Sequence, residues 1–190
     1  MTWKTVAWLA TAYVIGSYVW DVIVRPGREA RRARETADRL GKPMLNVGAG
    51  TPGSSLRAAL LGPQLVGDHN LDLAAPEGEP GRDRVVKGDV QDLPYRDREF
   101  GVAYTSHLLE HVDDPEKAAK ELNRVADVVV NVTPRWWAPH TWLYRDHQWF
   151  IRDNGKLVPL WRRARRAQRV RDRYRAIAGG NGKLPRIQEA

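Results

Sequence analysis

The stretch MLNVGAGTPG, residues 44–53, decides the fold. A short, mostly apolar run leads into a glycine-rich turn, and residues 54–61 behind the turn can form a helix. Glycine is needed in such a turn because a side chain would hold a ligand away from the backbone and because the turn uses unusual backbone angles. Strand, glycine turn and helix in this order form the first unit of a nucleotide-type α/β fold. Taken alone, the pattern also fits a dinucleotide oxidoreductase.

A second apolar stretch, LVGDHNLD at residues 65–72, places acids 20 and 24 residues beyond Gly48. An acid at the end of the second strand of this fold can accept both hydroxyls of a ribose. The alternation along the stretch ends at Asp72, just before a turn, so Asp72 is the preferred ribose ligand and Asp68 the alternative. The alternative to ribose binding is a structural role, in which either aspartate caps the helix that follows it.

Two further motifs bear on the dinucleotide alternative: GDVQDLP at residues 88–94 and SHLLEHV at residues 106–112. Together with the glycine turn and the acidic strand end, they resemble the class I S-adenosylmethionine-dependent methyltransferases of the small-molecule type, similar to methyltransferase type 11. The resemblance covers residues 43–134. It implies a Rossmann-like, doubly wound, mostly parallel sheet and S-adenosylmethionine as the cofactor.

The resemblance also implies which residues bind the cofactor. The methionine moiety would be enclosed by Gly48, Ala49 and Gly50. Asp89 would accept a hydrogen bond from the adenine amino group, and the amide of Val90 would reach a ring nitrogen. Asn46 stands where the family usually has an acid, so its contact with the methionine amine would be a neutral hydrogen bond, weaker than a charge-assisted one. Two glycines also depart from the family pattern: Gly53 comes one position late, and Gly101 replaces a common Asp.

The donor of a methyl group on a sulfonium is already activated, so the protein mainly has to position and desolvate the reactants. His107, at the end of the fourth strand, is the first candidate for a catalytic role and for a contact with cofactor or substrate. His111 is the second catalytic candidate, and the alternative is that this turn serves packing. His140, Asp146 and His147 could in principle hold a metal, but their spacing is unspecific and no metal site is predicted.

The N-terminal residues 1–24 are predicted to form a membrane helix. No charged residue occurs between Thr5 and Trp20, and the apolar stretch is roughly 24 to 33 Å long as a helix, near the roughly 30 Å of a bilayer core. Tryptophans near both ends resemble aromatic belts, and five arginines follow between Arg25 and Arg34. The positive-inside rule then predicts a single-pass protein with its domain on the cytoplasmic side. A signal peptide and an interfacial or buried helix are the alternatives.

The remaining chain divides into four predicted parts. Residues 25–41 are expected to form a solvated basic connecting helix that ends at Gly41, and residues 42–160 the methyltransferase-like domain. The C-terminal part of that domain is abbreviated, with two short strands at 149–151 and 157–158, so a membrane, a partner or a second copy could complete its substrate side. Residues 161–178 are predicted to be a basic amphipathic helix and residues 179–190 a disordered tail.

The net charge of +8 and the pI near 10 point to an anionic neighbour. An anionic membrane surface is favoured because the chain already has an apolar anchor and eight tryptophans. Nucleic acid is the alternative, but the acceptor-amine signature D/N-P-P-Y/F is absent after the fourth strand. The predicted function is methyl transfer to a small-molecule or lipid-like acceptor near the membrane. A noncatalytic membrane-attached binding or scaffold protein is the competing hypothesis.

Overall fold

The computed structural model describes residues 2–51, 56–144, 146–152 and 157–160. The predicted basic helix at 161–178, the tail at 179–190, Gly53 and the turn at 153–155 lie outside the described residues.

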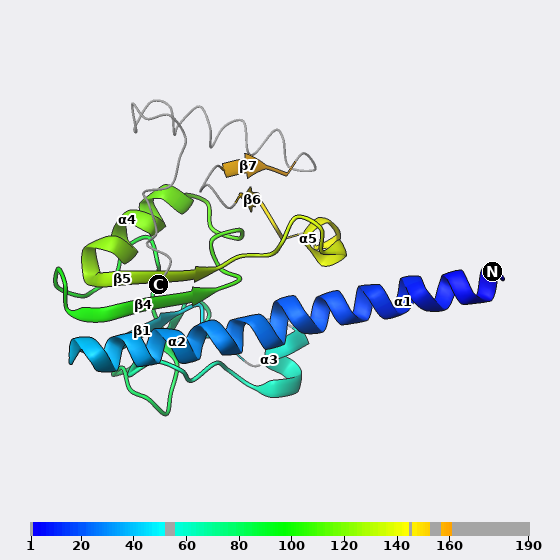
Figure 1. Ribbon diagram of the computed structural model, residues 1–190. Helices are drawn as coiled ribbons and strands as arrows, with labels where there is room; N and C mark the ends of the chain where they lie inside the picture. Colours follow the sequence, from blue (N-terminus) through cyan, green and yellow to red (C-terminus); the bar gives the residue numbers. More distant parts are fainter. Residues whose placement is uncertain (1, 52–55, 145, 153–156, 161–190) are drawn as a thin grey trace.

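A five-stranded parallel sheet forms the centre of the molecule (Figure 1). Its strands stand in the order β3-β2-β1-β4-β5, and every neighbouring pair is parallel. The bounds are β1 Met44–Val47, β2 His69–Asp72, β3 Val86–Lys87, β4 Phe100–Ser106 and β5 Ala126–Val132. The chain order reverses between β1 and β4, and ligands of open α/β sheets bind outside the carboxyl ends of the strands at such a point. The predicted Rossmann-like sheet is confirmed.

Two helices cover opposite faces of this sheet, which is why its central strands are buried on both sides. On one face, α4 (Pro115–Val125) packs its apolar side against alternate residues of the strands, among them Ala103 and Val129. On the other face, α2 (Arg25–Leu40) packs against the intervening residues, among them Val102 and Tyr104. All seven residues of β4 are buried in consequence.

The position of α2 differs from the predicted solvated connector. Ala30, Ala33 and Ala37 recur at helical spacing, all three are buried, and they lie against β1, β4 and β5. Alanine side chains are small enough to bring the helix backbone close to the sheet, and the many arginines then face outward. The helix ends at Gly41 as predicted, with a left-handed φ of 63°. The connecting helix is therefore part of the folded domain.

One continuous helix runs from Trp3 to Leu40. It consists of α1 (Trp3–Val19), a five-residue π-helix η1 (Trp20–Val24) and α2. Figure 1 shows α1 projecting away from the sheet, and almost all of its side chains are exposed although they are apolar. The helix is long and apolar enough to cross a membrane, judged by length and composition.

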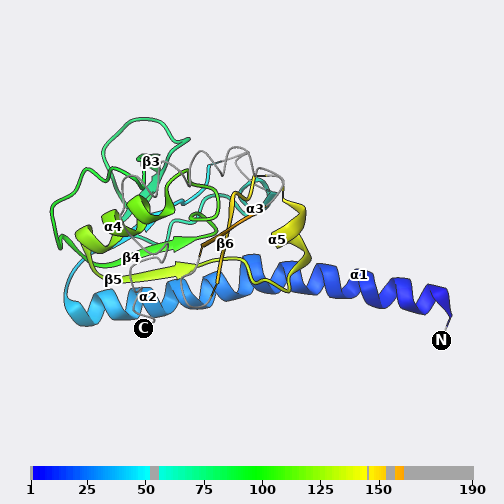
Figure 2. The same cartoon turned by 90° about the horizontal axis from the view of Figure 1, so that it is seen from above.

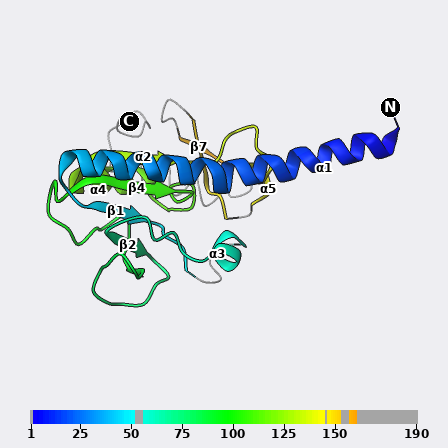
Figure 3. The same ribbon diagram turned by 60° about the horizontal axis from the view of Figure 1, so that its bottom comes forward.

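The shorter elements gather at the end of the domain from which α1 projects. They are α3 (Leu56–Leu61), α5 (Pro139–Leu143) and a hairpin of β6 (Trp149–Ile151) with β7 (Leu157–Pro159). The antiparallel pairing of β6 with β7 confirms the predicted short strands. Figures 2 and 3 show that α5 lies beside α1. They also show that α3 lies at the same end of the domain.

Candidate active site

The glycine turn follows β1 and is fastened to the end of β2 by backbone atoms. Gly48 and Gly50 have φ angles of +79° and +78°, a region that residues with side chains rarely adopt. The amides of Gly48 and Ala49 donate to the carbonyl oxygen of Leu71 at 2.8 and 3.0 Å. Asp72 reaches over from β2, and its Oδ2 accepts a hydrogen bond from the amide of Gly50 at 2.9 Å. The turn and the acidic strand end therefore lie side by side.

The end of β3 lies next to the same acid. The amide of Gly88 donates to the carbonyl oxygen of Asp72 at 3.2 Å, so the turn that begins at Asp89 stands beside the end of β2. Oδ1 of Asp89 accepts a hydrogen bond from the amide of Gln91 at 2.8 Å, and Val90 is buried. Asp89 itself is partly exposed. Gly50, Asp72 and Asp89 thus occupy the carboxyl ends of three neighbouring strands.

Asn46 has a different environment. Its side chain is buried in β1, and its amide group donates to the carbonyl oxygen of Gln64 and to Oδ1 of Asn70. Its own Oδ1 accepts no hydrogen bond within the described part of the chain. The side chain is thus engaged with the segment before β2 and with β2 itself, and its predicted contact with the methionine amine stays a prediction.

The carboxyl end of β4 carries the histidine motif. His107 follows β4 with a φ of 53°, an unusual backbone conformation for a residue with a side chain. Its Nε2 lies 2.9 Å from the backbone oxygen of Asp21, and its Nδ1 lies 3.3 Å from Oε1 of Glu110. Burial opposes protonation, but the Glu110 carboxylate and the backbone and charge of Asp21 outweigh it and raise the pKa of His107.

Glu110 is 1% exposed, and neither of its carboxylate oxygens has a hydrogen bond of normal geometry in the described residues. Burial would raise the pKa of Glu110, but the neighbouring His107, His111 and His147 lower it. The group is therefore a buried carboxylate that depends on nearby imidazoles.

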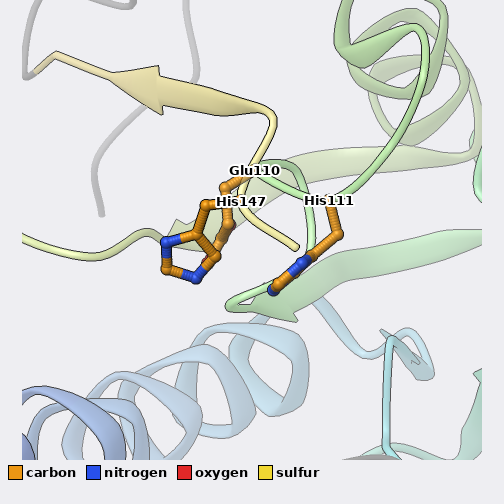
Figure 4. A group of neighbouring side chains, drawn as sticks. All are labelled: Glu110, His111 and His147. Atoms are coloured by element: carbon orange, nitrogen blue, oxygen red, sulfur yellow. The ribbon is translucent and has the colours of Figure 1, made fainter. Parts of the chain in front are cut away.

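His111 and His147 approach each other beside Glu110, with ring centroids 4.8 Å apart. Nδ1 of His111 lies 3.1 Å from the carbonyl oxygen of Asp146, and Nδ1 of His147 lies 2.9 Å from that of Thr141. Burial is the main reason why the pKa of His147 is lowered. Figure 4 shows the side chains of Glu110, His111 and His147 next to one another.

The long N-terminal helix also reaches this end of the sheet through Asp21, which is completely buried in η1. Its Oδ1 accepts a hydrogen bond from Arg25 at 2.8 Å, and its Oδ2 accepts one from the amide of Arg135 at 3.0 Å. Nε2 of His140 lies 3.2 Å from Oδ2. π-Helical turns within α-helices are frequent at functional sites. Here the π-turn joins the apolar helix to the segments that follow β4 and β5.

Comparison with known proteins gives the family. Residues 45–127 match the family described as "Methyltransferase domain". The chain carries a class I S-adenosylmethionine-dependent methyltransferase domain. The matched part of the chain runs from β1 to the start of β5 and contains the glycine turn, Asp72, Asp89 and the histidine motif.

Curated relatives match the chain over about the same length. Ajmaline N-methyltransferase of Rauvolfia serpentina is 33% identical over 93 residues, which are 44% of this chain and 32% of the relative. Sterol 4-C-methyltransferase of Caenorhabditis elegans is 30% identical over 92 residues, which are 43% of this chain and 27% of the relative. The chain thus spans less than a third of the length of these two relatives. A solved S-adenosylmethionine-dependent methyltransferase of Thermotoga maritima is 21% identical, with a TM-score of 0.33 and coverage of 60% of this chain and 59% of that one.

The cofactor of this methyltransferase family is S-adenosylmethionine, and the residues present fit it. The fit rests on two observations: the left-handed glycines leave the backbone of the turn bare, and a carboxylate stands at each of the next two strand ends. Donor and acceptor groups for a nucleoside are thereby collected at one edge of the sheet.

The sequence pattern does not reveal two features at the carboxyl ends of β4 and β5. Asp21 falls within the predicted membrane helix of residues 1–24, but the structure buries it against His140 and the backbone of Arg135. The sequence places His147 near His140 and Asp146, whereas the structure groups it with Glu110 and His111. The sequence carries one signal for the buried position of Asp21. Asp21 directly follows an apolar stretch, and a charged residue in such a place is costly unless it is paired.

Proposed function

We propose that this protein transfers the methyl group of S-adenosylmethionine to a small-molecule or lipid-like acceptor at a membrane. The observation that carries the proposal is the juxtaposition of the glycine turn, Asp72 and Asp89 at three adjacent strand ends. When bound, the cofactor supplies an activated methyl group. Gly48, Ala49 and Gly50 would enclose its methionine part, Asp72 would accept its ribose hydroxyls, and Asp89 with the amide of Val90 would hold its adenine.

The acceptor would bind at the carboxyl ends of β4 and β5, where His107 and His111 are the catalytic candidates. Both lie next to the buried carboxylate of Glu110. Their role in the proposal is to position the acceptor and to keep water away from the reacting atoms, because an activated donor mainly requires orientation and desolvation.

The membrane part of the proposal rests on the exposed apolar surface at one end of the domain. Most side chains of α1 are apolar and exposed, and further exposed apolar side chains stand on α3 and α5: Leu60, Leu61, Trp142 and Leu143. The hydroxyl of Tyr13 donates to the backbone oxygen of Trp137 at 2.9 Å, so the segment before α5 is fastened to α1. Aromatic and apolar residues in this position suit a membrane interface. We propose a single-pass protein with its domain on the cytoplasmic side, where the arginines of α2 meet an anionic surface.

The test is calorimetric titration of S-adenosylmethionine and S-adenosylhomocysteine into the full chain in detergent. We compare the protein with Asp89→Ala and with the matched control Asp92→Ala, which removes an exposed carboxylate from the same turn. Binding that Asp89→Ala weakens at least tenfold and Asp92→Ala leaves intact supports the cofactor site. No binding to the folded protein would refute the enzyme and leave a scaffold.

The buried environment of Asn46 favours one second candidate, a noncatalytic binding protein with this fold. The amide of Asn46 is engaged with Gln64 and Asn70, and the residue lacks the charge that an acid would offer to the methionine amine. An Asn46→Asp variant distinguishes the two candidates. An enzyme limited by this position binds the cofactor more tightly after the substitution, whereas a scaffold shows no binding in either form.

A further inference from the structure

Three potential metal ligands converge on the acceptor side of the sheet. One nitrogen of each imidazole of His111 and His147 and one carboxylate oxygen of Glu110 all lie within 4.8 Å of one another. Glu110 and His111 come from the loop after β4, and His147 comes from the segment ahead of β6, as Figure 4 shows. Glu110 and His147 are buried and His111 is partly exposed.

The two histidines are oriented as metal-binding histidines usually are. Nδ1 of His147 faces the carbonyl oxygen of Thr141, and Nδ1 of His111 faces that of Asp146. A carbonyl oxygen only accepts hydrogen bonds, so each Nδ1 must carry the proton, and each neutral ring keeps the lone pair of Nε2 for a ligand. Hydrogen bonds of this kind fix the tautomer and the ring orientation of metal-bound histidines.

The carboxylate of Glu110 is the second, independent observation. It is almost fully buried, and both of its oxygens lack a hydrogen bond of normal geometry. The nearest partner is Nδ1 of His107, 3.3 Å from Oε1, which leaves Oε2 available to a cation. A buried carboxylate without full pairing is costly, and a divalent ion removes that cost.

The two segments are held together by bonds that do not involve these three side chains. The amide of Gln148 donates to the backbone oxygen of Glu110 at 2.7 Å, and its side-chain amide donates to the backbone oxygen of His111 at 2.6 Å. Nε1 of Trp149 donates to the backbone oxygen of Val112 at 3.0 Å. The three ligands are therefore brought together before any ion binds, which reduces the entropy lost on binding.

We propose that Glu110, His111 and His147 form a binding site for a divalent transition metal of the zinc type. Two imidazoles and one carboxylate are a ligand set of catalytic zinc sites, which keep a further coordination position for water or substrate. At the acceptor end of the sheet, that position suits an oxygen of the methyl acceptor, whose hydroxyl proton becomes more acidic on the metal. The proposal that the three residues bind a metal does not depend on methyltransferase activity. The proposal that the metal binds an oxygen of the methyl acceptor rests on the proposed function.

The test uses the full chain without a polyhistidine tag, in detergent, after dialysis against a chelator. Co²⁺ is titrated and followed by its visible absorption, and bound Zn²⁺ is measured by elemental analysis after gel filtration. We expect one ion per chain. Glu110→Gln and His147→Ala should each lower the affinity for the metal at least tenfold. The control His69→Ala removes a histidine of β2 that contacts Tyr95, and it should leave the affinity unchanged.

Near-ultraviolet circular dichroism shows whether each variant is folded, and cofactor titration runs in parallel. Metal binding without cofactor binding would support the site and refute the proposed function. A folded wild-type protein that takes up less than a tenth of an equivalent of either metal overturns the site. Equal affinity in wild type, Glu110→Gln and His147→Ala also overturns it, because the ion would then bind elsewhere.

Discussion

The two halves of the sheet edge are built in different ways. At the ends of β1, β2 and β3, backbone amides and partly exposed carboxylates make the contacts, and all of them belong to a short part of the chain. At the ends of β4 and β5, buried side chains contact each other and distant backbone, and the bond from Arg135 to Asp21 joins residues 114 positions apart. The half at β1, β2 and β3, where we propose that the cofactor binds, is thus formed by local contacts. The half at β4 and β5, where we propose that the acceptor binds, also requires contacts with the helix that contains η1. Substitutions in the two halves should therefore affect different properties.

The largest effect is expected from Asp21→Ala, because it removes a buried charge from Arg25, the amide of Arg135 and His140. Breaking a buried pair by removing one partner costs about 3–5 kcal/mol. We expect the free energy of unfolding in detergent, followed by tryptophan fluorescence in denaturant, to fall by about that amount. The affinity of the remaining folded protein for S-adenosylmethionine should stay the same.

The control for this variant is Asp38→Ala, which removes an exposed carboxylate from α2 in the same long helix. It should change stability by less than about 0.5 kcal/mol. If both variants lost the same free energy of unfolding, the buried contacts of Asp21 would contribute no more to stability than an exposed carboxylate of the same helix. A loss of cofactor affinity in Asp21→Ala would show that the two halves are coupled.

The second largest effect is expected on cofactor binding and not on stability. Asp72→Ala should weaken binding of S-adenosylmethionine about 10- to 100-fold, since a hydrogen bond to a charged group contributes about 1.5–3 kcal/mol. The unfolding free energy should change little, because Asp72 is partly exposed and Gly48 and Ala49 keep their bonds to Leu71. Titration calorimetry beside Asp83→Ala, a substitution of an exposed acid, measures the difference. If Asp68→Ala weakened binding instead, the assignment of the ribose ligand would be wrong.

The same contrast explains what could be predicted from sequence. The glycine turn and the acid at the end of β2 follow from contiguous motifs, because each motif makes its contacts with its nearest neighbours along the chain or across one strand. The mostly parallel sheet is implied by the resemblance to the methyltransferase family. The packing of α2 could have been recognised from Ala30, Ala33 and Ala37, but the many arginines between them concealed the stripe. The grouping of His147 with Glu110 could not be derived, because it depends on how the chain returns after α5 and on the bonds of Gln148.

The smallest of the expected effects is a change in stability on substitution of Asp68, at the amino ends of β1 and β2. This position is away from both halves of the site and serves as their reference. Asp68 accepts hydrogen bonds from the side chain of Arg34 and from the amide of Met44, each at 2.7 Å, so it fastens α2 to the start of β1. Burial alone would raise the pKa of Asp68, but these bonds and the nearby Arg82 outweigh it and lower the pKa.

Because the folded-state pKa of Asp68 is lower than the unfolded value of about 3.9, its stabilisation is complete above that pH and is lost as the pH falls through the folded pKa. We expect Asp68→Asn to lower the unfolding free energy by about 1 kcal/mol at pH 7 and by progressively less below pH 4. Unfolding curves of wild type and variant at pH 7, 5, 4 and 3 measure this convergence. Because neither half of the site contacts Asp68 in the described residues, cofactor and metal affinities at pH 7 should be equal in the two proteins. A difference that does not shrink at all between pH 7 and pH 3 would mean that the asparagine disturbs the packing of α2 itself, and the effect of Asp21→Ala would then have to be judged against that disturbance.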